Sequence, residues 1–266
     1  MKKNSLSALI VGKFKSIQSV IFTTVAILVL CAVVIVTGVS MRFTNTSIFE
    51  NSSEYSQTII RQMNQNIDSY IDYMENISYL ITSNEDVQSY LFDEEIDTEA
   101  RGRLLSQFGT ILDSRSDIRN LGIIGPGGRR LINDGSKSVN PDLDLTTQDW
   151  YTDALESADG PILTSSHVQH IISGERPWVI TLSRGIRNLH GNGQRQGVFF
   201  IDLNYSAISS LCDQSTVGNK GYAFILDAAG NIVYHPQQQQ LYNELQTEKI
   251  DLIMQSDSDT VLTGTG

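Results

Sequence analysis

The sequence LGIIGPGGRRLI at residues 121–132 has a counterpart farther along the chain, FILDAAGNIVY at residues 224–234. Each stretch places a short apolar run before a glycine-bearing turn and another apolar run after it, which predicts a β-hairpin. Gly128 in the first stretch matches Gly230 in the second, 102 residues on. Glycine readily adopts the positive φ that a tight hairpin turn needs. A hairpin repeated at this spacing indicates two related modules in tandem.

Further strands and helices are expected around the first hairpin. Residues 197–203, GVFFIDL, are almost wholly apolar, as in a central strand, and residues 178–186, WVITLSRGI, alternate in part. Apolar spacing predicts helices at residues 99–115 and 205–212. Together these patterns predict an α+β fold with antiparallel sheets.

The N-terminal region contains an uncharged stretch from Ser16 to Met41. A helix that crosses a membrane needs about 20 apolar residues, and the apolar part of a cleaved signal peptide is shorter, about 7 to 15. A retained transmembrane helix is therefore expected at 16–41, with a cleaved signal as the alternative. Four lysines precede the stretch, and Arg42 alone follows it closely. This asymmetry places the N-terminus in the cytoplasm and the chain from residue 42 onward outside.

A long external helix is expected after a short polar stretch, Thr44–Ser53. Two apolar series repeat every seven residues along it: Ile60, Ile67, Met74 and Ile81, and, three positions later, Met63, Tyr70 and Ile77. This apolar seam is typical of a helix that packs along one narrow face. It fits packing against the helix's own sheet and packing against a second subunit equally well, and a homodimer is expected.

The composition excludes several functions. The net charge of −11 argues against a nucleic-acid partner, because phosphate binding needs a basic surface. Cys31 lies in the expected membrane helix, so Cys212 is the one external cysteine and has no intramolecular partner for a disulfide. No glycine-rich nucleotide loop with its lysine is present. We therefore expect no catalytic machinery and no cofactor in this chain.

The chain divides into five expected parts. The second module has a hairpin and a helical stretch at about 241–255, followed by a short segment, 259–266, so a fragment of a longer protein is expected. The parts are a cytoplasmic stub (1–15), a transmembrane helix (16–41), a long helix with a helical connection (42–115), a membrane-distal module (116–212) and the start of a membrane-proximal module (213–266).

Several stretches resemble the double Cache sensor domain, in which two PAS-like modules are strung on a long helix. DWYTDA at 149–154, SGERPWVITLSR at 173–184 and GVFFIDLNY at 197–205 resemble its distal module, and GYAFILDAAGNIVYHPQ at 221–237 resembles its proximal one. Together they resemble the YesM-like sensor histidine kinases. The resemblance implies a second membrane helix, a HAMP linker, a cytoplasmic kinase and a response regulator as partner, none of which lies in this sequence.

The resemblance also implies a ligand site in the distal module. In the amino-acid-binding branch of these domains an arginine lies two residues before a Trp-Tyr pair. A tyrosine and an aspartate follow on a neighbouring strand, and a last aspartate holds the ligand amine. Here Gln148 stands at the arginine position and Asp202 at the last aspartate. The candidate ligand-binding residues are Trp150, Tyr151, His167, Gln169 and Asp202. Trp150 and Tyr151 are equally well explained as core aromatics.

Without the arginine there is no guanidinium fork to hold a carboxylate. A sugar or another small neutral polar ligand is therefore favoured, and an amino acid is expected less. His167 and His170 have no evident third ligand, so no metal site is expected. The first expected function is ligand sensing coupled to a histidine kinase. The alternatives are the same domain on a chemoreceptor or a cyclic-nucleotide enzyme, and an interaction domain without a ligand.

Overall fold

The computed structural model of the chain describes residues 17–157, 160–191, 193–213, 222–227, 230–236 and 250–255. These residues divide into two compact units, one ending at Ser56 and one beginning at Gln57. The second unit contains the sheet and the site described below.

Helix α2 runs from Ile17 to Thr82 without interruption. Its segment Ile17–Thr44 has a mean hydropathy of 3.0 and no buried residue, and it is long and apolar enough to cross a membrane. The long helix expected after the polar stretch Thr44–Ser53 is continuous with the apolar segment, because α2 includes that stretch. Ser, Thr and Asn lower helix propensity by only a few tenths of a kcal/mol each relative to alanine, which does not break a helix of this length.

The second unit is built on one antiparallel sheet of five strands in the order β2-β1-β5-β4-β3. The strands are β1 (Ile118–Ile124), β2 (Arg130–Ile132), β3 (Ile162–Val168), β4 (Trp178–Arg187) and β5 (Arg195–Asn204). Strand β5 is central, and seven of its ten residues in a row, from Gly197 to Leu203, are buried. The predicted first hairpin and the predicted strands at 178–186 and 197–203 are confirmed.

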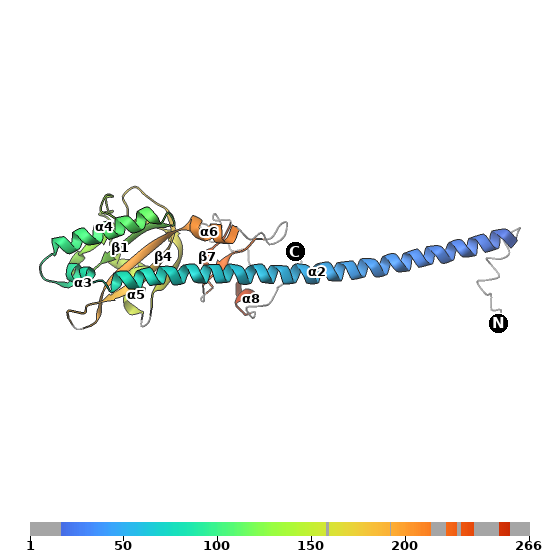
Figure 1. Ribbon diagram of the computed structural model, residues 1–266, viewed down its shortest axis with the longest axis horizontal. Coiled ribbons are helices and arrows are strands. Elements are labelled where there is room, and N and C mark those ends of the chain that lie inside the picture. Colours follow the sequence, from blue (N-terminus) through green and yellow to red (C-terminus); the bar gives the residue numbers. More distant parts are fainter. Residues whose placement is uncertain are drawn as a thin grey trace. The chain divides into compact units, whose positions relative to one another are not determined.

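Helices cover both faces of this sheet (Figure 1). One face packs on the later part of α2, on α3 (Glu85–Phe92) and on α4 (Thr98–Ser114), with Leu121, Leu182 and Ile201 from three strands in the same core. The other face packs on the short helix α5 (Asp149–Glu156). Two 3₁₀ turns, η1 (Pro126–Gly128) and η2 (Leu145–Thr147), complete the loops of the unit. Because successive side chains of a strand alternate between the faces, the two sides of the sheet can serve different purposes.

The apolar seam of α2 packs against the helix's own module. Met63, Met74 and Ile81 are buried in the core with the sheet residues, whereas Ile60 keeps 41% of its surface exposed. Of the two packing modes open from the sequence, the structure thus contains the first. Burying a methionine or isoleucine side chain contributes about 1.5 to 3 kcal/mol, so these three residues fix the helix on the sheet.

Three elements were not foreseen from the sequence: α3, α5 and β3. Helix α3 follows the capping residue Asn84, whose side chain accepts from the Asp86 N–H at 2.9 Å. Helix α5 is only eight residues long, and β3 has a register irregularity between Thr164 and His167. Short or irregular elements present too little periodicity to be read reliably.

The chain continues into α6 (Tyr205–Asp213), the hairpin β6 (Ile225–Leu226) and β7 (Ile232–Tyr234), and α8 (Ile250–Met254). The second predicted hairpin is confirmed, and Gly230 has the expected positive φ of 87°. The Tyr205 hydroxyl accepts from the His235 N–H at 3.0 Å and donates to the His235 carbonyl at 2.5 Å. Of the helix expected at 241–255 only α8 is described, and 241–249 and 259–266 lie outside the described residues.

Candidate functional site

The face of the sheet that packs on α5 carries a row of polar residues across its three middle strands. Asn120 of β1 pairs with Asp202 of β5, which pairs in turn with Thr181 of β4. Residues directly opposite each other in antiparallel strands share a face. All three are buried, with 1% or less of their surface exposed.

Asp202 is the acceptor at the centre of this row. Its Oδ1 accepts from Thr181 Oγ1 at 2.7 Å and from Gln169 Nε2 at 3.1 Å, and its Oδ2 accepts from Asn120 Nδ2 at 2.9 Å. Gln169 reaches it from the loop after β3. Three donors on one carboxylate are a charge-compensating arrangement, because each hydrogen bond favours the ionised form.

A chain of amides fixes the orientation of these donors. The Leu121 N–H donates to Asn133 Oδ1 at 3.0 Å, and Asn133 Nδ2 donates to Asn120 Oδ1 at 3.1 Å. The His170 N–H donates to Gln169 Oε1 at 3.0 Å, which directs the Gln169 amide nitrogen toward Asp202. Since backbone N–H groups can only donate, the amides of Asn133, Asn120 and Gln169 cannot flip without losing a bond.

Burial raises the pKa of Asp202, and the donors Thr181, Asn120 and Gln169 and the charge of His167 oppose that rise. His167 reaches the group through Thr181, whose Oγ1 lies 3.3 Å from His167 Nε2. An ammonium group placed here would compensate the buried charge directly, since an opposite charge within a few ångströms stabilises a carboxylate.

An aromatic cluster lies farther along the same face. Trp150 and Tyr151 of α5 are buried, and the Trp150 ring lies 4.9 Å from the Phe200 ring and 6.2 Å from the Tyr151 ring. Phe200 precedes Asp202 by two positions on β5, so both side chains lie on one face. Ser183 Oγ of β4 donates to the Trp150 carbonyl at 2.7 Å and holds α5 to the sheet.

Two loops lie against each other beside this face. Val139 forms a bridge with Ile172, and the Ser173 N–H donates to the Ser138 carbonyl at 3.0 Å. Glu175 of the second loop forms ion pairs with Arg119 of β1 and with Lys137, the latter at 3.0 Å. This clasp, defined by Glu175, Arg119 and Lys137, ties the segment after β2 to the segment after β3.

One donor of the aromatic cluster, Trp150 Nε1, and two hydroxyls of β3, Thr164 Oγ1 and Ser166 Oγ, are buried without a hydrogen-bond partner among the described residues. Thr164 of β3 pairs with Thr181, so it lies on the Asp202 face of the sheet. An unsatisfied buried donor costs about 1 to 3 kcal/mol. The face therefore combines one saturated acceptor with several unsaturated donors, which suits a ligand with a cationic end and an anionic end.

The structure brings the five sequence-predicted residues to this one region. Gln169 contacts Asp202 directly, His167 reaches it through Thr181, and Trp150 with Tyr151 forms the aromatic cluster. Sequence reasoning missed Asn120, Asn133 and Thr181. Asn120 lies in the part of β1 that precedes the apolar run from Leu121, and Thr181 is one polar residue in the alternating strand 178–186. Gln148, at the position of the expected arginine, is half-buried, and its Nε2 donates to the Asp144 carbonyl at 3.3 Å.

A family model described as "dCache_1: Cache domain" matches residues 44–265. The methyl-accepting chemotaxis protein McpC of Bacillus subtilis is 26% identical over 230 residues, which cover 85% of this chain. The chain spans about a third of the length of that relative, 33%.

Several solved structures with a similar fold are ligand-binding domains of chemoreceptors. The ligand-binding domain of Pseudomonas fluorescens CtaA in complex with L-isoleucine has a TM-score of 0.58 and 19% identity and covers 77% of this chain and 80% of that one. The Pseudomonas aeruginosa amino-acid chemoreceptor PctC with GABA has a TM-score of 0.54 and 22% identity, over 71% and 78% of the two chains. Campylobacter jejuni Tlp3 with L-norvaline has a TM-score of 0.54 and 20% identity, over 75% of each.

The ligands of these neighbours overturn the expected ligand preference. The expectation that a sugar or another neutral molecule is favoured over an amino acid is wrong, because the solved neighbours hold amino acids and GABA. The preference rested on Gln148 at the arginine position, together with aromatic and neutral polar residues and the resemblance to YesM-like kinases. Burial and hydrogen bonding show two features that the sequence does not: the buried acceptor Asp202, and buried donors, Trp150 Nε1 among them, that have no partner among the described residues.

Proposed function

The chain belongs to the Cache domain family, and from this premise we propose that it is the extracytoplasmic ligand-binding region of a bacterial chemoreceptor that senses an amino acid. Its chemotaxis relative and its chemoreceptor structural neighbours support the receptor class. The observation that carries the ligand class is Asp202, a fully buried carboxylate with three fixed donors, on the same sheet as buried donors that have no partner in the described part of the chain.

In this proposal Asp202 holds the ligand's ammonium group. The carboxylate is the buried anion on this face, and an ammonium ion carries three donors for it. Thr181 and Gln169 each have a further acceptor or donor position from which they help to orient the same group. The contact is charge-assisted, which is worth about 1.5 to 3 kcal/mol.

In this proposal the ligand's carboxylate is directed toward Trp150 Nε1 and the Ser166 hydroxyl, while the Thr164 hydroxyl, which lies opposite Thr181, is nearer the ammonium end. These neutral donors replace the guanidinium that the resemblance places at position 148, where this chain has Gln148. Hydrogen bonds from neutral groups are roughly half as strong as those from charged ones. The ammonium end is therefore expected to contribute more to affinity than the carboxylate end.

Binding has a direct route to the membrane helix. A ligand at a hundredfold excess over its dissociation constant stabilises the bound state by about 2.7 kcal/mol. The sheet that carries Asp202 packs its other face on α2, through Met74 and Ile81. A ligand that binds one arrangement of the sheet and helix better than another shifts their populations. The lysine asymmetry across Ile17–Thr44 supports a cytoplasmic N-terminus and an external sensor.

A histidine kinase output is the second candidate. The stretches 149–154 and 173–184 favour it, since they resemble the YesM-like kinases. The curated relative is instead a chemotaxis receptor, which is why the chemoreceptor is preferred. In either case we propose that this region binds the ligand and transmits the signal, and we assign no catalytic step to it.

The test is a thermal-shift screen of the full chain in nanodiscs against L-isoleucine, L-valine, L-serine and GABA. We expect at least one of them to raise the Tm. The Asp202→Asn substitution should lower the affinity for that ligand roughly 10- to 100-fold, because the charge-assisted contact is lost. Asp113→Asn, which removes an exposed carboxylate on α4, is the matched control and should leave binding unchanged. A ligand whose affinity survives Asp202→Asn would place the site elsewhere.

A further inference from the structure

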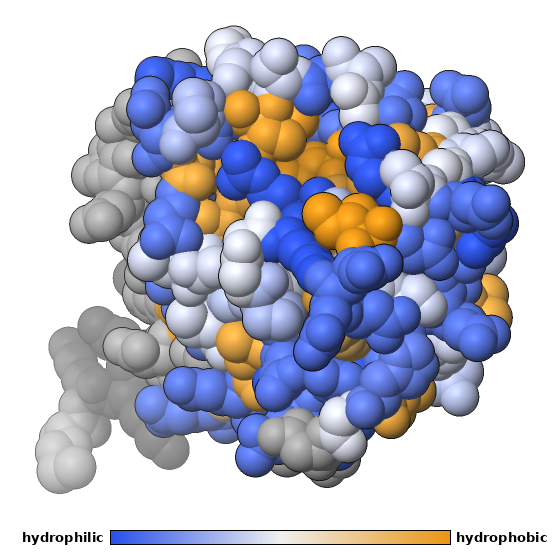
Figure 2. Space-filling view, turned by 90° about the vertical axis from the view of Figure 1, so that its left-hand side faces the viewer, coloured by the Kyte–Doolittle hydropathy of each residue, from blue (hydrophilic) through white to orange (hydrophobic). Residues whose placement is uncertain are grey.

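Polar contacts join helix α2 to its module in addition to the apolar seam. Near the C-terminal end of the helix, Ser78 Oγ accepts from Arg184 Nε of β4 at 2.8 Å. Figure 2 views this end of the unit and shows a largely hydrophilic surface with scattered hydrophobic residues. Eight residues before Ser78, the Tyr70 hydroxyl donates to Asp117 Oδ2 at 2.8 Å, where the chain passes from α4 into β1. The two contacts thus tie α2 to the module at different levels.

Asp117 belongs to a short segment, residues 115–117, that connects α4 to β1 and is called the junction below. Within it, Arg115 donates to the Asp117 carboxylate through Nε at 2.8 Å and through Nη2 at 2.5 Å. The Arg115 guanidinium also lies over the Tyr73 ring, 4.5 Å from its centroid. Tyr70 and Tyr73 are three residues apart and so lie on one side of the helix. The junction therefore contacts two neighbouring side chains of α2.

The hydrogen bond between Tyr70 and Asp117 is charge-assisted. The hydrogen bond from Arg115 holds the pKa of Asp117 below its usual range, against the opposing effect of burial. Burial and the hydrogen bond to Asp117 raise the pKa of Tyr70. At neutral pH the carboxylate is therefore ionised and the phenol keeps its proton. The Arg115 and Asp117 side chains are only 23% and 22% exposed, so salt screens this contact less than one on an open surface.

The junction is also bonded to the end of β5. The Asn204 N–H donates to the Asp117 carbonyl at 2.7 Å, and Asn204 Nδ2 donates to the Ser116 carbonyl at 2.7 Å. Asn204 is the last residue of β5 and lies two positions after Asp202. The end of the strand that carries Asp202 is thus fixed to the segment that contacts Tyr70.

The same end of β5 begins the connection to the second hairpin. Helix α6 starts at Tyr205, directly after Asn204, and the Tyr205 hydroxyl is hydrogen-bonded to the His235 backbone. The strand that carries Asp202, the helix α2 and the connection to the second hairpin therefore meet at the junction.

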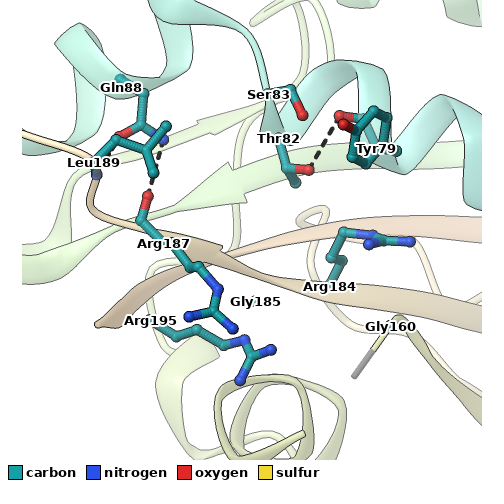
Figure 3. Close-up of a pocket in the computed structure, with 10 residues that line it drawn as sticks. All are labelled: Tyr79, Thr82, Ser83, Gln88, Gly160, Arg184, Gly185, Arg187, Leu189 and Arg195. Carbon is teal, nitrogen blue, oxygen red and sulfur yellow. Dashed lines mark hydrogen bonds between the residues drawn. The ribbon is translucent and has the colours of Figure 1, made fainter. Parts of the chain in front are cut away.

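The other contact, near the end of α2, provides a control position. Figure 3 shows Arg184 of β4 together with Tyr79 and Thr82 of α2. Tyr79 is 60% exposed, and its carbonyl accepts from Thr82 Oγ1 at 3.3 Å, a contact within the helix itself. Removing the Tyr79 hydroxyl leaves this backbone contact in place. Tyr79 is therefore the matched control for Tyr70.

We propose that the junction couples the hydrogen-bond network of Asp202 to α2, with Tyr70 and Asn204 as positioning residues. The coupling rests on the proposed function, since a ligand at Asp202 is what it transmits. Apolar packing is non-directional, whereas hydrogen bonds depend on distance and angle. A ligand that favours one position of β5 therefore also favours the position of α2 that keeps the bonds of Asn204 and Tyr70.

Hydrogen exchange of the full chain in nanodiscs tests the coupling without any ligand. Asp202→Asn alters the network, and we expect it to change the exchange rates of the α2 amides around Tyr70 about threefold or more, as for groups within one network. In a Tyr70→Phe background, which keeps the ring and removes the hydroxyl, Asp202→Asn should leave these rates unchanged. In a Tyr79→Phe background the effect of Asp202→Asn should persist in full.

A purely structural Tyr70 gives a different result. Tyr70→Phe would then raise exchange with and without Asp202→Asn, and the difference between the two would remain. That outcome, or α2 amides that do not respond to Asp202→Asn in the wild-type background, would overturn the proposal.

Two further variants extend the test. Thr181→Val removes one donor from Asp202 and takes the place of Asp202→Asn if that variant does not fold, with the same expected results. Asn204→Ala keeps the backbone N–H and removes the bond to the Ser116 carbonyl, so it should reduce the response of the α2 amides.

A ligand arm separates this proposal from the proposed function. L-Isoleucine, L-valine, L-serine and GABA are each added to the wild type and to Tyr70→Phe. A compound that binds should change the exchange of the same α2 amides in the wild type alone, while calorimetry shows that Tyr70→Phe still binds it. A response of α2 that is equal in both proteins would contradict the coupling. If none of the four binds, the proposed ligand class fails, and the comparison with Asp202→Asn still decides the fate of the junction.

Discussion

The two ends of the candidate ligand site differ in how completely the protein satisfies its own polar groups. At one end, Asp202 accepts three hydrogen bonds from amides and a hydroxyl whose orientations are fixed. Farther along the face, Trp150 Nε1 is buried without a hydrogen-bond partner among the described residues, as are the hydroxyls of Thr164, opposite Thr181, and of Ser166 on the edge strand β3. The hydrogen bonds of Asp202 form when the protein folds, whereas the unpaired donors can gain hydrogen bonds from a ligand. The proposed direction of the ligand, with its ammonium group at Asp202, rests on this difference.

The largest expected effect comes from removing the saturated acceptor. Asp202→Ala leaves the donors of Asn120, Gln169 and Thr181 buried without an acceptor. Each unsatisfied group costs about 1 to 3 kcal/mol, so we expect a loss of at least about 3 kcal/mol in the free energy of unfolding. Urea denaturation of the full chain measures it.

The exposed Asp113→Ala on α4 is the control and should change stability by less than about 0.5 kcal/mol. An Asp202→Ala protein as stable as the Asp113→Ala protein would mean that the network around Asp202 contributes little.

The opposite sign is expected at the unsaturated end. Ser166→Ala removes a buried hydroxyl that has no partner among the described residues, so the ligand-free protein should become more stable, by about 1 kcal/mol. The same substitution should lower the affinity for the amino-acid ligand. Ser106→Ala, an exposed serine on α4, is the control and should alter neither quantity. A Ser166→Ala protein that is destabilised without ligand would show that the hydroxyl is engaged in the folded state.

The pH dependence follows from the raised pKa of Asp202. As the pH rises, the Asp202 carboxyl of the unfolded chain loses its proton first, and the carboxyl of the folded protein keeps its proton to a higher pH. The contribution to stability is therefore present below the unfolded pKa of about 3.9 and is lost as pH rises through the folded value. An ammonium ligand needs the ionised carboxylate, so its affinity should rise over the same interval.

The measurement is the difference in Tm between the wild type and Asp202→Asn, with and without ligand, across that pH range. Taking the difference cancels the pH-dependent contribution of other carboxylates to the Tm. Asp117 is one of them: Arg115 lowers its pKa, so its contribution to stability grows as the pH rises. A difference that is independent of pH would show that Asp202 does not titrate there.

The smallest effect is expected at the clasp. Glu175→Gln removes ion pairs to Arg119 and Lys137 that are partly exposed, so the stability change should stay below about 1 kcal/mol. Because the clasp joins the two loops beside the site, ligand dissociation should be faster. Stopped-flow displacement tests this, and raising the salt concentration should reduce the difference between wild type and variant. An unchanged dissociation rate would show that the contact between the two loops does not help to retain the ligand.

The sequence predicts the sheet better than it predicts the network on it. Strands 178–186 and 197–203 and both hairpins are evident because burial imposes apolar runs and turns impose glycine. Asn120 and Thr181 are single polar residues within strands, and only the strand register places them beside Asp202. Strand register depends on pairing between segments that are far apart in the sequence, so it cannot be predicted from a local pattern of residues.

The ligand preference failed for a related physical reason. One residue, Gln148, was taken to decide whether a carboxylate could be held. The donors that can replace a guanidinium, Trp150 Nε1 and Ser166 Oγ, become visible only when burial and hydrogen bonding are known.

The direction of the ligand is tested most directly by calorimetric titration of the amino acid that stabilises the chain most, alongside its N-acetyl derivative and its carboxamide. Acetylation removes the ammonium charge, and amidation removes the carboxylate charge. We expect acetylation to weaken binding about 100-fold or more, since it leaves Asp202 facing a neutral group, and amidation to weaken it about tenfold. Equal losses, or a larger loss on amidation, would contradict an ammonium group held by Asp202.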